Sequence, residues 1–193
     1  MTYRPPLAEM AFAGALVGQD RLAATARFAE ATRETREAVL AEAGRLAAEV
    51  VAPLDAPGDA LGTRIENGVV RTPPGFAEGF RALAEGGWIG AAAGPAHGGM
   101  GLPRSLAFMV QEMLAGACLS LQACLLLTQG QIEALEAHAS DELAERVIPN
   151  LVSGAWTGTM NLSEPQAGSD VGALTTRADR KSTRLNSSHV CSS

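Results

Sequence analysis

The chain has 193 residues, of which 47% are hydrophobic, and its formal net charge is −6. This length and composition suit one domain, or slightly more, with a hydrophobic core. The acidic balance argues against a nucleic-acid-binding protein, and no apolar run is long enough for a membrane span.

The cysteines indicate the cellular compartment. Cys118, Cys124 and Cys191 have neither the spacing of metal ligands nor that of a disulfide framework. Cys118 and Cys124 lie in an apolar stretch, and we expect both to be buried free thiols. Secretion is rejected because Glu9 interrupts the apolar segment near the N-terminus. We therefore predict a protein of the reducing cytoplasm.

Short helices are predicted in the N-terminal leader. The first is a short amphipathic segment over residues 8–17. The second is expected over residues 20–31, where apolar residues recur at helical spacing and Asp20 is a good N-cap.

The clearest helix follows the leader. Residues 35–51 carry one apolar stripe, and Pro53 is expected to end the helix. Residues 55–74 are then expected to form a loop. Its Asn67-Gly68 pair suits the type I′ turn of a hairpin, but we interpret the pair as a simple surface turn.

The chain after residue 74 predicts four more helices. Gly86-Gly87 is expected to close the first, and Ser140 to cap the last, which Pro149 ends. The two middle helices are apolar over most of their surface and are expected to be largely buried. The predicted ranges are residues 76–85, 104–116, 119–139 and 141–149.

The histidines and the glycine-rich loop offer no chemistry of their own. His97 has no nucleophile and no second metal ligand at a suitable spacing, so we assign it no role and predict no metal site. His138 lies among acidic residues of a helix and is expected to be solvated. The glycines of residues 98–101 lack the Lys-Ser/Thr pair of a phosphate-binding loop.

A motif near the C-terminal end carries the strongest functional signal. Alternation of bulky and small residues predicts a strand over residues 156–162. The strand breaks at Ser163-Glu164-Pro165, and Gly168 permits a tight turn or a close approach of a ligand. A strand end of this kind offers free amide donors and hydroxyls, which suit a flat heterocycle or a phosphate.

The octet Ser163–Asp170, S-E-P-Q-A-G-S-D, resembles the flavin-binding signature of the acyl-CoA dehydrogenase family. Residues 95–102 resemble a glycine-rich segment of the same family, with Ala96 in place of the usual acidic residue. The pattern Y-x-x-P-L-x-x-M from Tyr3 to Met10 resembles one branch of the family, which includes the 3-methylmercaptopropionyl-CoA dehydrogenases.

The resemblance implies a mainly α fold, with four parts along the chain. Residues 1–33 would form an N-terminal helical extension, and residues 34–154 the helical-bundle N-terminal domain. Residues 155–178 would be the first strand or strands of a truncated β-barrel middle domain. Residues 179–193 resemble a translated sequencing adapter, and we expect an artefactual or disordered tail.

The family reaction is the α,β-desaturation of an acyl-CoA thioester, with hydride transfer to FAD. Ser169 would be the best substrate contact, and Ser163 would place its hydroxyl near the reactive part of the flavin. No catalytic base is expected in this chain, because the family's catalytic Glu lies in a later domain and Glu164 is not given that role. The resemblance implies these cofactor contacts: Met160, Asn161, Leu162, Ser163, Gly168 and Ser169.

The resemblance also implies partners and leaves alternatives open. Electron-transfer flavoprotein would reoxidise the flavin, and the full-length protein would form a homo-oligomer. An acyl-CoA oxidase or a flavin monooxygenase of the same fold is an alternative, as is a non-enzymatic helical binding module. We expect this chain alone to be inactive and to retain no stoichiometric FAD.

Overall fold

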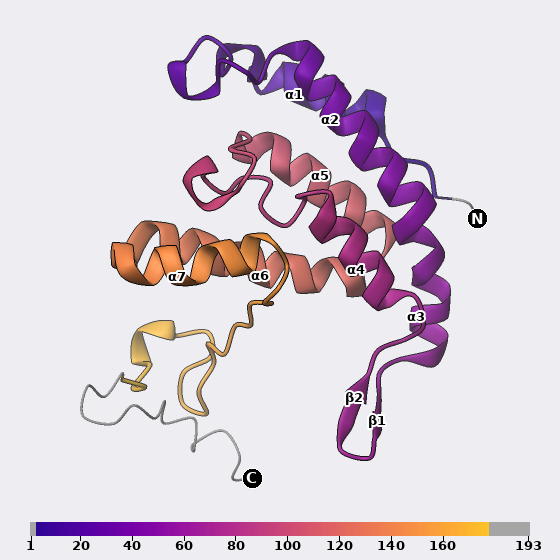
Figure 1. The fold of residues 1–193 in the computed structure, drawn as a ribbon, viewed down its shortest axis with the longest axis vertical. Helices are drawn as coiled ribbons and strands as arrows, with labels where there is room; N and C mark the ends of the chain where they lie inside the picture. The colour runs from indigo at the N-terminus through magenta and orange to yellow at the C-terminus, as the bar shows by residue number, and fades with distance from the viewer. Residues whose placement is uncertain (1–2, 178–193) are drawn as a thin grey trace. The chain divides into compact units, whose positions relative to one another are not determined.

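The computed structural model describes residues 3–177 of the chain. Helices dominate this part, which confirms the mainly α fold class, and they are accompanied by one small antiparallel sheet (Figure 1). One compact unit ends at Thr159 and another begins at Met160. The elements are α1 (Leu7–Leu16), α2 (Arg33–Leu46), α3 (Asp55–Leu61), β1 (Arg64–Glu66), β2 (Val69–Arg71), α4 (Phe76–Glu85), α5 (Arg104–Ala117), α6 (Leu119–His138) and α7 (Asp141–Val152).

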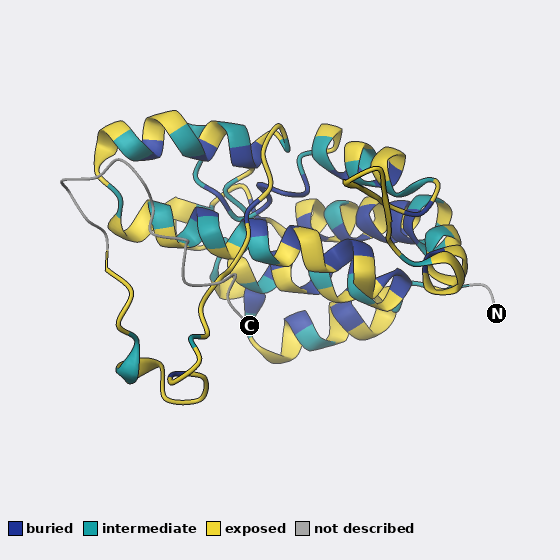
Figure 2. Cartoon of the chain, turned by 90° about the horizontal axis from the view of Figure 1, so that it is seen from below, coloured by how far each residue is buried: buried dark blue, intermediate teal, exposed yellow. Residues whose placement is uncertain are grey.

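The core of the helical unit is built around α5 and α6. Helix α5 packs against both α2 and α6, and α6 also packs against α7. The helices carry buried residues on part of their surface and exposed residues on the rest (Figure 2). Burial of each large aliphatic side chain contributes about 2 kcal/mol to folding. The fully buried large side chains include Leu83, Leu106, Leu114, Leu125 and Ile148.

Apolar residues also cover an outward side of α5 and α6, which corrects the expectation of largely buried helices. Phe108, Leu119 and Leu126 are all exposed. Cys118 is buried as expected, but Cys124 is exposed. A helix that is apolar on all sides normally packs against two layers of protein. The described bundle provides one of these layers. No helix within residues 3–177 has both the length and the apolar character needed to cross a membrane.

Several helix ends agree with the local signals in the sequence. Helix α4 spans Phe76–Glu85 as predicted. It is followed by Gly87, whose φ of 75° is readily available only to glycine. The hydroxyl of Ser140 accepts a hydrogen bond from the backbone N–H of Leu143 at 3.4 Å, which caps α7.

Neither proline stops its helix, contrary to prediction. Helix α2 is followed by a π-helical turn and then by a 3₁₀ turn in which Pro53 occupies an early position, where no N–H is needed. Helix α7 continues through Pro149 as far as Val152. The lost hydrogen bond there is offset because Ile148 and Leu151, on either side of the proline, are buried.

The helix predicted over residues 20–31 does not form. Two one-turn 3₁₀ helices, Gln19–Arg21 and Ala26–Phe28, occupy this range. Asp20 caps no helix with its side chain; its carboxylate binds the guanidinium groups of Arg36 and Arg33 instead. Hydrogen bonding from Arg36, and to a lesser extent from Arg33, lowers the pKa of the Asp20 carboxyl. The ion pairs tie the leader to the start of α2.

The expected loop over residues 55–74 contains more structure than the sequence predicted. Helix α3 occupies its first part, and strands β1 and β2 pair antiparallel with Ile65 opposite Val70. Asn67 and Gly68 have φ values of 52° and 76°, as a type I′ turn requires. The pair therefore closes a hairpin, not the simple surface turn that we preferred.

The strand predicted over residues 156–162 is also absent. This stretch is irregular and is tied by single hydrogen bonds, such as that from the N–H of Gly158 to the hydroxyl of Thr128 at 3.0 Å. A strand is stabilised by pairing with a neighbour. From residue 155 to 177 the only bridge is an isolated pair, Glu164 with Ala167.

Candidate functional site

The motif begins as an exposed, irregular segment. Met160 is 63% exposed and Leu162 is 45% exposed, and Asn161 and Ser163 are exposed as well. Within residues 3–177, the backbone groups of residues 160–163 form no hydrogen bond with protein groups. This part of the chain is neither helical nor packed inside. It therefore offers free backbone donors and acceptors to a ligand.

A tight turn follows this segment. The backbone N–H groups of Glu164 and Ala167 each donate to the carbonyl oxygen of the other residue at 3.0 Å. Pro165 stands between them, where its fixed φ favours a turn. Next comes Gly168, at which an added Cβ would meet no atom within 4 Å. The turn itself does not need a glycine there, and space is left open above its backbone.

The side chain of Glu164 closes the loop. Its carboxylate accepts hydrogen bonds from the N–H of Thr176 at 2.8 Å and from the N–H and hydroxyl of Thr175 at 3.0 and 2.9 Å. The side-chain amide of Gln166 also donates to it. Hydrogen bonding from Thr176 and then from Thr175 holds the pKa of Glu164 well below its usual range. This carboxylate therefore stays ionised and occupied, and it is a poor proton acceptor.

The sequence did not reveal this role of Glu164. Its donors lie 11 and 12 residues further along the chain, and no single helix or strand connects them to Glu164. Asp170, by contrast, has a local role in the turn that follows it. Its carboxylate accepts from the N–H of Gly172 at 3.1 Å and caps a one-turn 3₁₀ helix, Val171–Ala173.

Residues 95–102, the glycine-rich segment that resembles the family, form a loop whose backbone conformation requires its glycines. Gly98 and Gly101 have φ values of 86° and 65°, and a Cβ at Gly99 would lie only 2.2 Å from the carbonyl oxygen of Ala93. These glycines are therefore required by the folding of the loop on itself. They form no phosphate-binding loop of the strand–loop–helix kind.

His97 and His138 lie outside the Ser163–Asp170 motif, and His138 is exposed as expected. His97 Nδ1 is buried and lies 3.7 Å from Glu136 Oε1, too far for a hydrogen bond. In the described part of the chain, no group of three His, Cys, Asp or Glu side chains could hold a metal ion.

The helices from α2 to α7 match a known domain. Residues 33–155 match the model of the acyl-CoA dehydrogenase N-terminal domain. The chain belongs to the acyl-CoA dehydrogenase family. The resemblance drawn from the Ser163–Asp170 motif is thereby confirmed by a different part of the sequence.

Individual relatives agree with this assignment. A 3-methylmercaptopropionyl-CoA dehydrogenase from Ruegeria pomeroyi is 38% identical over 172 residues, which is 89% of this chain and 29% of the relative. A butyryl-CoA dehydrogenase from Syntrophomonas wolfei is 33% identical over 132 residues, 67% of this chain and 22% of the relative. A broad-specificity linear acyl-CoA dehydrogenase from Mycobacterium tuberculosis is 29% identical over 166 residues, 84% of this chain and 27% of the relative.

These matches have a common limit. The chain spans less than a third of the length of each of these relatives. The family and the helical domain are thus established for this chain, and the similarity to the Ruegeria protein agrees with the branch indicated by the leader.

Proposed function

We propose that this acyl-CoA dehydrogenase family chain supplies the flavin-facing loop of an FAD-dependent enzyme that introduces an α,β double bond into an acyl-CoA thioester. The observation that carries the proposal is the exposed, unpaired backbone of residues 160–163, followed by the open turn at Gly168. Both lie in the motif that resembles the family's flavin-binding signature.

The residues of this loop suit the two chemical parts of the cofactor. The free backbone groups of Met160, Asn161 and Leu162 would meet the hydrogen-bonding edge of the isoalloxazine ring, and the exposed hydroxyl of Ser163 would donate to it. Gly168 leaves room for a pyrophosphate or for the CoA part of the substrate, and Ser169 beside it can donate a hydrogen bond. FAD, when bound, supplies the acceptor for the hydride that leaves the β-carbon.

The apolar outward side of α5 and α6 supports a larger enzyme. Phe108, Leu119 and Leu126 are exposed in this chain. A surface of this kind is normally covered by another layer of protein or by a ligand. The relatives are more than three times longer than the part matched here, so we propose that further protein covers this side and encloses the acyl chain.

The carboxylate that removes the α-proton must come from outside this loop. Glu164 is held ionised by Thr175 and Thr176, and its lone pairs are occupied. We therefore propose that the base belongs to a further part of the enzyme and that this chain alone is inactive. Electron-transfer flavoprotein as oxidant, homo-oligomerisation and a cytoplasmic location belong to the same proposal.

The test is made on the protein expressed from the complete reading frame. We expect a yellow protein whose flavin is bleached anaerobically by a saturated acyl-CoA. A colourless protein, or a flavin that no saturated acyl-CoA reduces, would overturn the proposal. Release of hydrogen peroxide in air at the rate of turnover would instead identify an acyl-CoA oxidase.

A further inference from the structure

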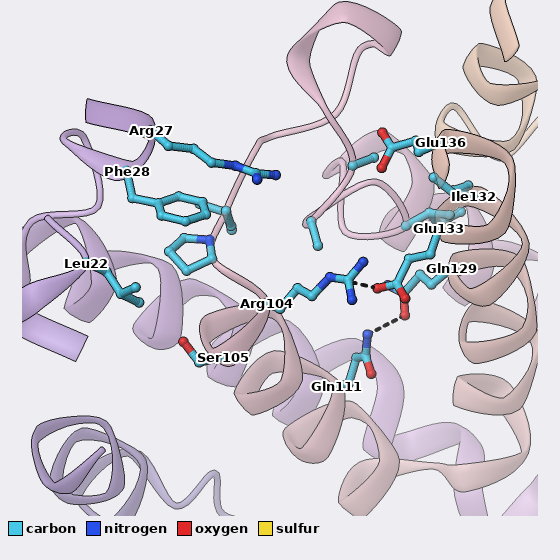
Figure 3. A pocket seen from close by; sticks show the side chains of 15 residues that line it. Leu22, Arg27, Phe28, Arg104, Ser105, Gln111, Gln129, Ile132, Glu133 and Glu136 are labelled. Atoms are coloured by element: carbon cyan, nitrogen blue, oxygen red, sulfur yellow. Dashed lines mark hydrogen bonds and ion pairs between the residues drawn. The ribbon is translucent and has the colours of Figure 1, made fainter. Parts of the chain in front are cut away.

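The helical unit contains a pocket of about 340 Å³. None of the residues that line it belongs to the Ser163–Asp170 motif. Its walls come from the leader, from the loop before α5, and from α5 and α6 (Figure 3). The leader contributes Leu22, Arg27 and Phe28. Because the family domain begins at residue 33, this wall is an addition to the domain that the family shares.

The leader is held firmly against the bundle. The buried side chain of Gln19 donates to the hydroxyl of Ser105 at 3.0 Å. The buried guanidinium of Arg36 donates to the carbonyl oxygen of Ala31 at 2.8 Å. These contacts lie on both sides of residues 22–28, so the leader wall of the pocket has a defined position.

The charged side chains that line the pocket differ in whether they have a polar partner. Arg104 lies 3.4 Å from the carboxylate of Glu133. Glu136 accepts a hydrogen bond from the N–H of Gly94 at 2.7 Å. Arg27 has no carboxylate partner within residues 3–177. It is therefore the lining cation that is available to a ligand.

The position of Arg27 suits a carboxylate. Its guanidinium lies 5.2 Å from the centroid of the Phe28 ring. A guanidinium attracted to an aromatic ring can still donate bidentately to a carboxylate through its N–H groups. Figure 3 shows the Arg27 side chain extended from the leader, beside the Phe28 ring. A carboxylate group would be bound there by a charge-assisted pair of hydrogen bonds.

The remaining walls determine the rest of the ligand. Phe28, Pro103 and Ile132 give the pocket apolar surface. Glu133 and Glu136 repel a second negative charge on the α6 side, so the acid group is directed towards the leader. The volume is near the lower end for small-molecule sites. We propose that this pocket binds a small monocarboxylate, with its acid group on Arg27 and its short apolar body between Phe28 and Ile132.

This inference does not depend on flavin binding or on dehydrogenation. Isothermal titration calorimetry of the full chain with hexanoate, 1-hexanol and hexylammonium separates the contributions of charge and apolar contact. We expect hexanoate to bind at least about tenfold more tightly than either analogue. Equal binding of hexanol, tighter binding of hexylammonium, or no binding of hexanoate would each overturn the proposal.

Substitution of Arg27 tests whether this residue provides the positive charge that binds the carboxylate. Arg27→Gln should weaken hexanoate binding about tenfold and leave hexanol binding unchanged. Arg21→Gln is the matched control, because Arg21 is also an exposed leader arginine but does not line the pocket. Both positions are exposed, so circular dichroism and thermal unfolding should match the parent protein. Unchanged hexanoate binding by Arg27→Gln, or an equal loss in both variants, would refute the assignment.

Discussion

The carboxylate of Glu164 accepts a hydrogen bond of 2.8 Å from the backbone N–H of Thr176, twelve residues further along the chain. This contact closes the loop that carries Gly168 and Ser169. An acidic residue of the Ser163–Asp170 motif thus has a structural role. The loop can present its other polar groups because Glu164 holds its two ends together.

The ionisation of Glu164 gives a prediction about pH. The ordinary pKa of this carboxyl is 4.5, and hydrogen bonding from Thr176 and then Thr175 lowers its pKa in the folded loop. The stabilisation is therefore complete above the unfolded pKa and is lost as the pH falls through the lower, folded pKa. In an NMR titration, the amide signals of Thr175 and Thr176 should remain constant through pH 4.5 and move only at clearly lower pH. A midpoint near 4.5 would contradict the clamp, and Glu164→Gln should remove the transition.

Substitution of Gly168 tests the proposed cofactor binding separately from folding. Since a Cβ at this position meets nothing within 4 Å, Gly168→Ala should leave the thermal unfolding midpoint unchanged. If the open space receives a pyrophosphate or CoA, the same methyl group should weaken FAD or acyl-CoA binding by about tenfold or more in the full-length protein. Flavin content and acyl-CoA titration measure this. Full retention of both affinities would show that no ligand approaches this backbone.

Ser163 tests the role of the hydroxyl. Its side chain is exposed, so Ser163→Ala should fold normally. In the full-length protein we expect anaerobic flavin reduction by acyl-CoA to slow by about 10²-fold, because a donor to developing negative charge is lost. Ser163→Thr keeps the hydroxyl and should retain most of the rate. Equal rates for the Ala and Thr variants would exclude the hydroxyl from the reaction.

Two neighbouring leucines of α6 test which side faces the core. Leu125 is 0% exposed, whereas Leu126 is 52% exposed. Leu125→Ala should lower the free energy of unfolding by about 2–5 kcal/mol. Leu126→Ala should change it by about 0.5 kcal/mol or less in this chain. Urea unfolding of both variants measures the difference, and similar losses would contradict the packing of α6.

Local signals in the sequence determined a large part of the fold. Phe76, Phe80 and Leu83 define the apolar side of α4, and Gly87 supplies the left-handed residue after its end. Ser140 predicted the start of α7 for a similar reason. At these helix ends the interacting groups lie within a few residues, so the sequence alone contains the whole interaction. The Ser163–Asp170 motif was informative because its residue types and order are specific.

Tertiary structure decided what depends on distant partners. Asp20 reads as an N-cap, but Arg36 and Arg33 take its carboxylate. Pro149 reads as a helix end, but burial of the residues beside it continues α7. Residues 156–162 have the alternation of a strand, and a strand forms only where a second one is present to pair with it. Only the folded chain brings Arg27 to a pocket wall and Thr176 to Glu164, because no single helix or strand connects the residues that meet in either place.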